Sequence, residues 1–374
     1  MKVLLEAAHP AHVHFLAPIG RELIARGHEV VLAVRPKDVA RELARDSGLL
    51  TLEPNYSTLG RSKGLRGAIS QAFELLRRVS WLIGVIRRLQ VNLVVTRNPS
   101  GVMAATVARV PSIFDTDDGR AAGTHLGLAK PFATIITTPR LLPDQLGSRQ
   151  RRYAGLKSTV FLHPAHFSPR REVLDDYCID QSVPLIIIRF SANSASHDHG
   201  VQSVPSELVD AVLSRVLPIA NVVISHEGSQ AVICGPVTAS ELAFRRSGER
   251  MKEAGLVVSA GDFLHLLAFS DLHVGDSGSV AMEAAALGVF TLRIADTRRA
   301  MISALGERYG LVEDYRLGES EQFLTRLDEV LEGPTKRLSS VQSGHQRLLD
   351  ESRDVVGWFA DQCEELMSTQ LSSG

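Results

Sequence analysis

The residues best suited to chemistry lie in a short turn between a strand and a helix, in the segment VGDSGSVAMEAAALG at 274–288. The pattern predicts that a strand ends at Val274 and that a helix begins near Ser277. Gly275 and Gly278 would let the main chain approach a ligand closely. The unpaired N–H groups of the first helical turn, together with the helix dipole, favour a phosphate or a diphosphate. This segment therefore predicts an anion-binding site.

Three side chains extend this predicted site. Ser277 and Ser279 add hydroxyl donors at the start of the helix. Glu283 lies one to two turns further on, where a carboxylate can accept hydrogen bonds from the two hydroxyls of a ribose. The alternative is an ordinary capped helix that follows a glycine turn, and the local sequence alone leaves both interpretations open.

Histidines follow the first predicted strand, at His9, His12 and His14. A histidine near its ordinary pKa of ~6.5 could act as the general base for an acceptor hydroxyl, or donate a hydrogen bond to a phosphate. His12 is the first candidate for such a catalytic role. The alternative is that these histidines pack against the first helix or cap it.

Carboxylates cluster in the segment IFDTDDG, at Asp115, Asp117 and Asp118. They follow a buried strand, and ligands of α/β proteins bind at the carboxyl ends of such strands. One of them could act as a base, or raise the pKa of a neighbour through like-charge repulsion. A solvated turn that caps a helix is the other interpretation.

The elements that must position these residues alternate between strand and helix, which is typical of parallel sheets covered on both faces. We expect strands at Lys2–Leu5, Glu29–Val34, Leu49–Leu52, Asn92–Thr96, Ser112–Phe114, Pro184–Arg189, Ala220–Ser225, Gly255–Val258 and Asp271–Val274. The main helices are expected at Phe15–Arg26, Leu65–Leu89, Ser206–Leu217, Asp262–Phe269, Ser277–Leu287, Glu319–Leu331 and Lys336–Met367. The segment Tyr153–Gln181 is interpreted as the connection between two halves.

Composition excludes several classes of protein. The net charge of -1 and an aromatic content of 5% argue against nucleic-acid binding. The three cysteines, Cys178, Cys234 and Cys363, form no CxxC pair and predict free thiols rather than zinc ligands. His197, Asp198 and His199 alternate on a loop and are expected to face water, so no metal is predicted. No apolar run approaches the ~20 residues of a membrane span, and the N-terminus lacks a signal peptide, so we expect a cytoplasmic protein.

The helix around residues 61–90 is rich in arginine and interleaved with apolar side chains. It could lie on an anionic membrane surface, which would suit a lipid-linked acceptor and a location at the inner face of the membrane. The alternative is that its apolar face packs on the sheet and its arginines face solvent.

Several segments resemble known families. Residues 262–293 are similar to the donor-binding region of non-hydrolysing UDP-N-acetylglucosamine 2-epimerases, which carry a DSGG…EEA…LG pattern at this spacing. The N-terminal HPAHVHFLAPIGRELIARGHEV resembles the first strand, loop, helix and second strand of the N-acetylglucosaminyltransferase that makes lipid II. The whole chain resembles the domain of unknown function 354 family, through PAHVHF, RYAGLKSTVFL, PLIIIRFSANSASHDHG and GDSGSVAMEAAALG.

The resemblance implies an α/β protein of the GT-B fold, with two Rossmann-like, doubly wound parallel-sheet domains facing across a cleft. The implied domains are 1–165 on the acceptor side and 166–335 for the nucleotide sugar, with 336–374 returning to the first domain. It also implies ligand roles for individual residues. Ser277, Gly278 and Ser279 would hold a diphosphate, Glu283 the ribose and Phe263 the base, while Arg189 or Asn193 would clamp the donor phosphates. Ser279 departs from the family pattern, which has glycine there.

These observations favour a metal-independent glycosyltransferase of polysaccharide or glycoconjugate biosynthesis, which uses a nucleotide-diphosphate sugar and needs no cofactor. UDP is favoured as the nucleotide through the resemblance. A nucleotide-sugar 2-epimerase is the alternative, but VVTRNPS (94–100) and IIIRFSANS (186–194) replace the epimerases' catalytic GDT and HRREN-like segments. A non-catalytic nucleotide-sugar-binding protein is the third hypothesis.

Overall fold

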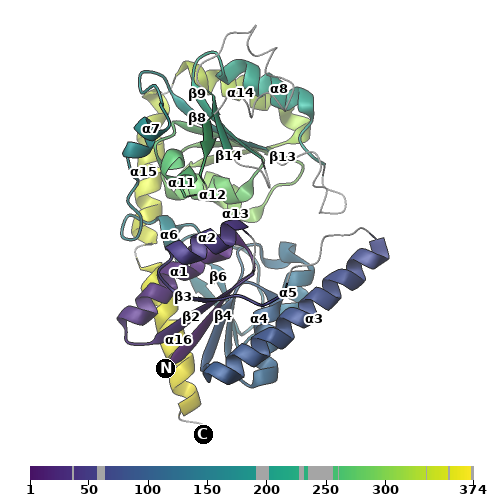
Figure 1. The fold of residues 1–374 in the computed structure, drawn as a ribbon. Coiled ribbons are helices and arrows are strands. Elements are labelled where there is room, and N and C mark those ends of the chain that lie inside the picture. Colours follow the sequence, from purple (N-terminus) through teal and green to yellow (C-terminus); the bar gives the residue numbers. More distant parts are fainter. Residues whose placement is uncertain are drawn as a thin grey trace. The chain divides into compact units, whose positions relative to one another are not determined.

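The computed structural model describes residues 1–35, 38–56, 64–190, 202–226, 231–234, 256–259, 261–333, 335–352 and 354–371. The chain forms two compact units, Met1–Phe161 with Ser352–Gly374, and Leu162–Glu351. Each unit is an α/β sandwich built on its own sheet (Figure 1). No helix within the described ranges is both long enough and apolar enough to cross a membrane.

The first unit is built on a seven-stranded sheet in the order β3-β2-β1-β4-β5-β6-β7. Every neighbouring pair is parallel, so all carboxyl ends meet at one edge. The chain order reverses beside β1, which has β2 on one side and β4 on the other, and such a switch point is where ligands bind in open α/β sheets. The strands are β1 (Lys2–Ala7), β2 (Glu29–Val34), β3 (Leu50–Leu52), β4 (Leu93–Thr96), β5 (Ser112–Asp115), β6 (Ile135–Pro139) and β7 (Gln150–Tyr153).

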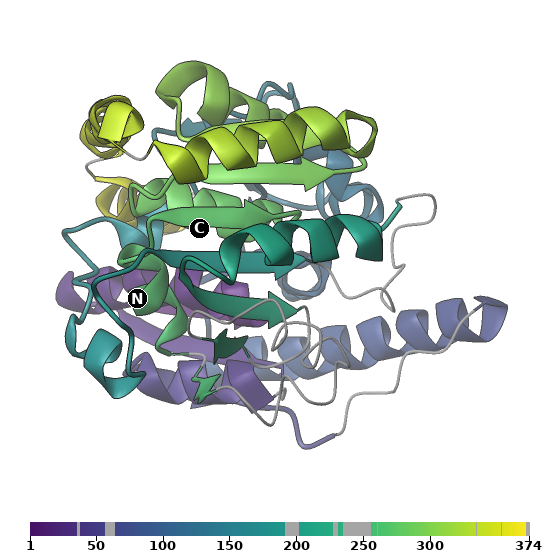
Figure 2. The ribbon, with the colours of Figure 1, turned by 90° about the horizontal axis from the view of Figure 1, so that it is seen from above.

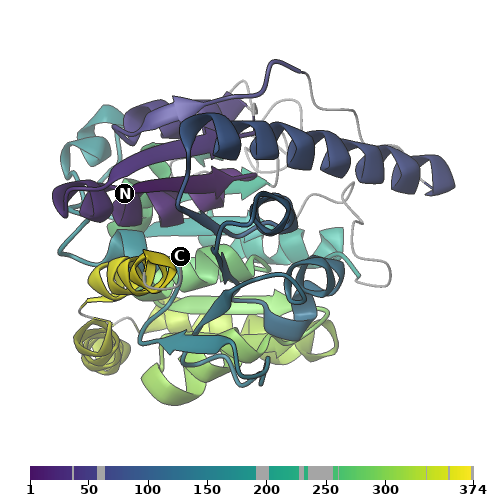
Figure 3. The same ribbon diagram turned by 90° about the horizontal axis from the view of Figure 1, so that it is seen from below.

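Alternate residues of these strands pack against helices on opposite faces of the sheet. Leu5 packs in one core with Phe15 and Phe359, whereas Leu4 packs in another with Leu82. The first core includes α1 (Pro10–Ala25), α2 (Asp38–Asp46) and α16 (Val355–Leu371). The opposite face carries α3 (Gly64–Leu89), α4 (Pro99–Ala108) and α5 (Thr124–Ala129), as Figure 3 shows from below.

The second unit also has a seven-stranded sheet, in the order β11-β10-β9-β8-β12-β13-β14. Five strands from β9 to β14 pair in parallel, but β10 is antiparallel to both β9 and β11. The predicted parallel sheet is therefore confirmed for five strands, and β10, which the sequence did not predict, is antiparallel because residues 227–230 are too short a connection for a parallel crossover. The strands are β8 (Leu185–Phe190), β9 (Asn221–His226), β10 (Ala231–Cys234), β11 (Leu256–Val258), β12 (Leu272–Gly275), β13 (Thr291–Ala295) and β14 (Val312–Arg316).

Helices α8 (Ser206–Val216) and α14 (Ser320–Glu332) pack together over one face of this sheet (Figure 2). A second group consists of α11 (Phe263–Ala268), α12 (Gly278–Ala286), α13 (Ala300–Tyr309) and α15 (Thr335–Glu351). The single terminal helix expected from the sequence is two helices, α15 and α16. The side chain of Asp354 accepts a hydrogen bond from the Gly357 N–H at 3.0 Å, which caps the start of the second helix.

Candidate functional site

The predicted turn connects β12 to α12 in the second unit. The strand ends at Gly275, and Ser277 is the N-cap residue, whose side chain accepts from the N–H of Val280 at 3.4 Å. The Ala281 N–H makes the first main-chain bond of the helix, 3.0 Å to the Ser277 carbonyl oxygen. The N–H groups of Gly278 and Ser279 therefore have no acceptor within α12 and face the space before the helix.

The surroundings of the two glycines in this turn differ. A Cβ atom on Gly275 would lie 1.9 Å from the carbonyl oxygen of Arg189 on the paired strand β8. Strand pairing thus requires this glycine for a reason separate from the predicted approach of a ligand, which stays a prediction. A Cβ on Gly278 would meet nothing closer than the Arg299 side chain, at 3.4 Å.

Arg293, a buried arginine that was not predicted to belong to the site, supports the turn. Arg293 of β13 donates from Nε to the Asp276 carbonyl oxygen at 3.1 Å, and from Nη1 to Asp314 Oδ1 at 2.6 Å. Its side chain is 3% exposed, so these bonds hold the turn on the sheet in a water-poor environment. The signal in the sequence is a charged residue within the otherwise apolar strand TLRIA.

The side chains predicted to contact a nucleotide gather near this helix start. Ser279 is exposed, and Glu283 is half-buried one turn later, so both lie on the same side of α12. Phe263 is half-buried at the start of α11, which contacts α12. Arg189, near the end of β8, pairs with Gly275 and donates from Nη1 to Ser225 Oγ at 3.0 Å.

The predicted phosphate clamp Asn193 lies outside the described residues, as do Ser194, His197, Asp198 and His199. Within the described ranges, no group of three or more histidine, cysteine, aspartate or glutamate side chains is arranged to hold a metal ion.

A buried group of charges, which we call the charge cluster, lies at the carboxyl edge of the first sheet. It consists of Arg97, Asp115, Asp117 and Lys157. Arg97 follows β4 and pairs with Asp115 Oδ2 at 3.3 Å, and it also donates a hydrogen bond to Asp117. Lys157 Nζ lies 3.1 Å from Asp117 Oδ2. All four side chains are less than one-tenth exposed, so the predicted carboxylates do not form a solvated turn. Of the three predicted carboxylates, only that of Asp118 is exposed.

The two buried carboxylates have opposite electrostatic environments. Burial raises the pKa of Asp115 to about 6, because the pairing with Arg97 and the hydrogen bond from Thr137 only partly offset the loss of hydration. Burial acts in the same direction on Asp117, but Arg97 and Lys157 outweigh it and hold the pKa of that carboxyl well below its usual range. Neighbouring carboxylates with separated pKa values are a common arrangement of acid and base groups.

One polar atom of this region, the hydroxyl oxygen of Tyr153, is buried without a hydrogen-bond partner among the described residues. Asp115 Oδ2 and Arg97 Nη1 are also buried without a hydrogen bond, but they form an ion pair with each other at 3.3 Å. Burial and the nearby Asp115 carboxylate raise the pKa of Tyr153 well above its usual range, so it stays a neutral hydroxyl. Buried polar groups are normally satisfied, so the Tyr153 hydroxyl indicates a place where water or a substrate atom completes the bonding.

His12 lies in the first turn of α1. Its Nδ1 accepts a hydrogen bond from the Ala8 N–H at 3.3 Å, so the neutral ring carries its proton on Nε2. Burial, followed by the positive charge of Arg97, lowers its pKa well below 6.5. In this geometry His12 is a neutral donor through Nε2, which disfavours the expected role as a general base.

The other two histidines have local structural roles, as the alternative interpretation allowed. His9 is the N-cap of α1 and accepts from the Ala11 N–H at 3.3 Å. His14 stacks on Phe161 with ring centroids 5.3 Å apart, and burial lowers its pKa to about 4.

A second buried ion pair, also missed from the sequence, lies beside this region. Arg78 of α3 donates from Nε to Glu6 Oε1 at 2.6 Å, and Thr96 donates to Glu6 Oε2 at 2.5 Å. Ser100 also donates to Glu6 at 3.1 Å. These bonds tie α3, β4 and α4 to the end of β1 and position the residues that follow those strands.

Comparisons with known proteins identify the fold. No family model matches the sequence, and no curated protein sequence matches it, so membership of the domain of unknown function 354 family stays a prediction. UDP-GlcNAc 2-epimerase from Neisseria meningitidis bound to UDP-GlcNAc has a TM-score of 0.65 at 13% identity, over 99% of this chain and 100% of that chain.

Two solved glycosyltransferase structures match over similar lengths. MurG of Acinetobacter baumannii has a TM-score of 0.55 at 15% identity, over 96% of this chain and 98% of that one. The glycosyltransferase VinC in complex with dTDP has a TM-score of 0.59 at 15% identity, over 99% of this chain and 100% of that one. At these identities the likeness shows the fold alone, and it confirms the predicted GT-B-like architecture of two α/β domains.

Proposed function

We propose that the protein is a metal-independent glycosyltransferase that uses a nucleotide-diphosphate sugar, with UDP as the favoured nucleotide. The observation that carries the proposal is the β12–α12 turn, where two main-chain N–H groups and the positive end of a helix dipole meet an exposed serine. The fold is shared with enzymes whose structures hold UDP-GlcNAc and dTDP. Fixed main-chain donors stabilise the negative charge that develops on a departing nucleoside diphosphate, and they do so without a metal.

The donor is proposed to bind with its diphosphate at Gly278 and Ser279 and its ribose at Glu283. The half-buried carboxylate of Glu283 can accept from both ribose hydroxyls, since hydrogen bonds to a charged acceptor are the stronger kind. Phe263 on α11 is proposed to lie near the base. Arg189, from the adjacent strand, is proposed to approach the phosphates.

The acceptor is proposed to bind at the carboxyl edge of the first sheet. We assign the general base to Asp115, since its pKa of about 6 allows both protonation states near neutral pH. Asp117 suits this role poorly because two cations hold it ionised. His12 is proposed to donate through Nε2 to an acceptor oxygen or phosphate. This assignment predicts transfer activity that rises with pH through about 6 and is lost in Asp115→Asn, while donor binding is kept.

The proposal is tested by calorimetry with UDP, GDP, dTDP, CDP and their sugar conjugates. We expect one diphosphate series to bind, and Glu283→Ala to weaken that binding by about 1.5–3 kcal/mol, as for lost hydrogen bonds to a charged group. Glu321→Ala on α14 removes an exposed carboxylate elsewhere in the same unit and should leave the affinity unchanged. If no nucleotide binds, or if both variants bind like the wild type, the assignment of the donor site is wrong.

An epimerase is the second candidate, because a buried carboxyl with a pKa of about 6 also suits proton transfer at a sugar carbon. The two activities differ in product. Incubation of the bound nucleotide sugar without any acceptor would convert it to a stereoisomer if the protein is an epimerase. A transferase leaves it unchanged until an acceptor is added, and a binding protein leaves it unchanged throughout.

A further inference from the structure

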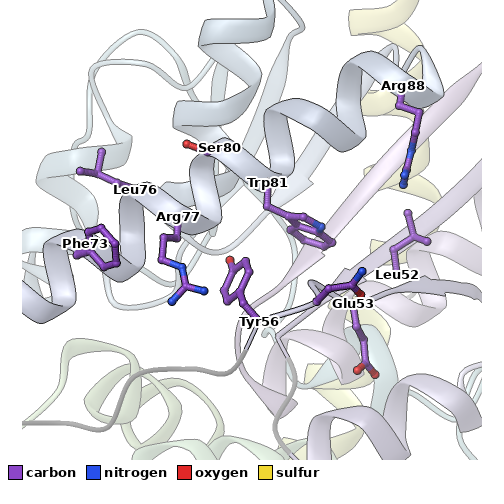
Figure 4. A pocket seen from close by; sticks show the side chains of 10 residues that line it. Leu52, Glu53, Tyr56, Phe73, Leu76, Arg77, Ser80, Trp81 and Arg88 are labelled. Atoms are coloured by element: carbon purple, nitrogen blue, oxygen red, sulfur yellow. The ribbon is translucent and has the colours of Figure 1, made fainter.

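The first unit has a hollow of about 790 Å³ that none of the proposed donor or acceptor residues lines. One wall is a face of α3, and the other is the segment that follows β3 (Figure 4). A volume of this size is typical of sites that enclose a small organic ligand. The lining residues are Leu52, Glu53, Asn55, Tyr56, Phe73, Leu76, Arg77, Ser80, Trp81 and Arg88.

The apolar part of the wall is unusually open to solvent. Phe73 is 55% exposed and Leu76 is 59% exposed, and Ile69 continues the same face of α3 at 62%. Residues spaced in this way lie above one another on a helix, so they form a continuous apolar stripe. Exposed apolar side chains that gather beside a hollow indicate a binding surface for an apolar group.

The polar part of the wall is positively charged. Among the described residues that line the hollow, Glu53 is the acid, and Arg41 neutralises it through two hydrogen bonds at 2.8 and 3.0 Å. Arg77 lies over the ring of Tyr56, with its guanidinium carbon 4.2 Å from the ring centroid. No carboxylate pairs with Arg77 among the residues that the structure describes. The charge of Arg77 therefore remains available to a ligand.

Tyr56 supplies a further group for recognition. Its hydroxyl oxygen is buried and lacks a hydrogen-bond partner within the described part of the chain. Burial raises the pKa of Tyr56, so the hydroxyl keeps its proton and can donate. Its side chain lies between those of Arg77 and Trp81 in the hollow (Figure 4).

We propose that this hollow binds a single-chain anionic amphiphile such as an alkyl phosphate. Its chain lies along Trp81, Phe73 and Leu76, and its head group is held by the guanidinium of Arg77 and the hydroxyl of Tyr56. An arginine fork suits an anionic oxygen pair, and the aromatic walls suit methylene groups. The charge of the unpaired arginine selects an anion over a cation of equal chain length. This site is independent of the proposed transferase activity.

Tryptophan fluorescence tests the proposal directly, because Trp81 lines the hollow and Trp358 is the only other tryptophan of the chain. In the full-length Trp358→Phe protein, a brominated dodecyl phosphate below its micelle concentration should quench Trp81 saturably. Arg77→Gln in this background should weaken the apparent affinity about tenfold, the effect of losing one charged hydrogen-bonding partner. Arg140→Gln, which removes an exposed arginine elsewhere in the unit, should leave it unchanged.

The apolar wall is tested in the same assay. Phe73→Ser should weaken binding several-fold, whereas Ile219→Ser, at an apolar side chain of the second unit that is 45% exposed, should not. Inorganic phosphate alone should neither quench nor compete at equal concentration. Equal quenching by a brominated dodecyl trimethylammonium, or an unchanged affinity in Arg77→Gln, would overturn the proposal. Quenching that appears only with anionic vesicles would also overturn it, and would indicate a membrane-docking face instead.

Discussion

Replacement of Arg97 by glutamine is the sharpest test of the charge cluster. Arg97 is the cation shared by both buried carboxylates, Asp115 and Asp117, and its own side chain is 7% exposed. Its removal leaves two buried negative charges with Lys157 as their remaining cation within the cluster. Deleting one partner of a buried ion pair typically costs about 3–5 kcal/mol, so we expect the free energy of unfolding of the first unit to fall by that amount at pH 7.5.

The pH dependence of this loss follows from the two carboxyl pKa values. Arg97 lowers the pKa of both groups, so in the variant both pKa values rise. The folded variant then holds protons that the unfolded chain releases, and its stability falls as the pH rises. The deficit relative to the wild type should therefore be largest at pH 7.5 and clearly smaller at pH 5.

Urea unfolding followed by tryptophan fluorescence measures this loss, since Trp81 and Trp358 both belong to the first unit. Arg151→Gln is the matched control, because it removes a partly exposed ion pair to Glu365, worth about 0–1 kcal/mol. A loss in Arg97→Gln no larger than in this control would show that Arg97 does not compensate the two buried carboxylates. A large loss that is equal at pH 5 and pH 7.5 would show that the loss does not come from their ionisation.

Three further predictions concern single substitutions. Gly275→Ala should destabilise the second unit by about 3 kcal/mol or more in thermal unfolding, whereas Gly278→Ala should cost far less; similar losses would contradict the strand-packing explanation. Arg293→Met should lower the free energy of unfolding by about 3 kcal/mol in urea, followed by circular dichroism, because it leaves Asp314 buried without its cation. It should also weaken nucleotide binding in calorimetry. Unchanged binding would show that Arg293 does not support the turn. The raised pKa of Asp115 stabilises the fold only while the group is protonated. The free energy of unfolding of the wild type relative to Asp115→Asn should therefore fall by about 3 kcal/mol between pH 4 and pH 7. A constant difference would show that the pKa of Asp115 is not raised.

The strand–turn–helix of the second unit could be predicted because all of its signals are local. An apolar strand, two glycines, a capping serine and an alanine-rich helix follow one another within 274–288. The role of Gly275 could not be predicted in the same way. Its clash partner, the carbonyl oxygen of Arg189, lies on a strand that is distant in sequence and becomes a neighbour only through sheet pairing.

The charge cluster shows the same limit more strongly. Asp115 and Asp117 stand out in the sequence, but their partners Arg97 and Lys157 follow other elements and look like ordinary surface residues. Only the parallel order of β4, β5 and their neighbours brings these side chains together. The sequence therefore predicted the carboxylates and the sheet edge, but neither their burial nor the separation of their pKa values.

Errors in the elements also have physical causes. Strand β6 was missed because its apolar pair Ile135 and Ile136 is followed by two threonines and a proline, which weakens the apolar pattern. Helix α1 begins earlier than expected, at Pro10, because proline suits the first helical position and His9 supplies the cap. The terminal segment is divided into two helices at Asp354, whose side chain caps the second one. The sequence did not predict this division, because an aspartate can equally lie on the polar face of one continuous helix.

The most direct test of the central claim is a crystal structure of the protein with UDP or the nucleoside diphosphate that binds most tightly. We expect phosphate oxygens within hydrogen-bond distance of the Gly278 and Ser279 N–H groups, and ribose hydroxyls on the carboxylate of Glu283. A nucleotide bound with its phosphates away from the start of α12 would show that this helix start is not the donor site.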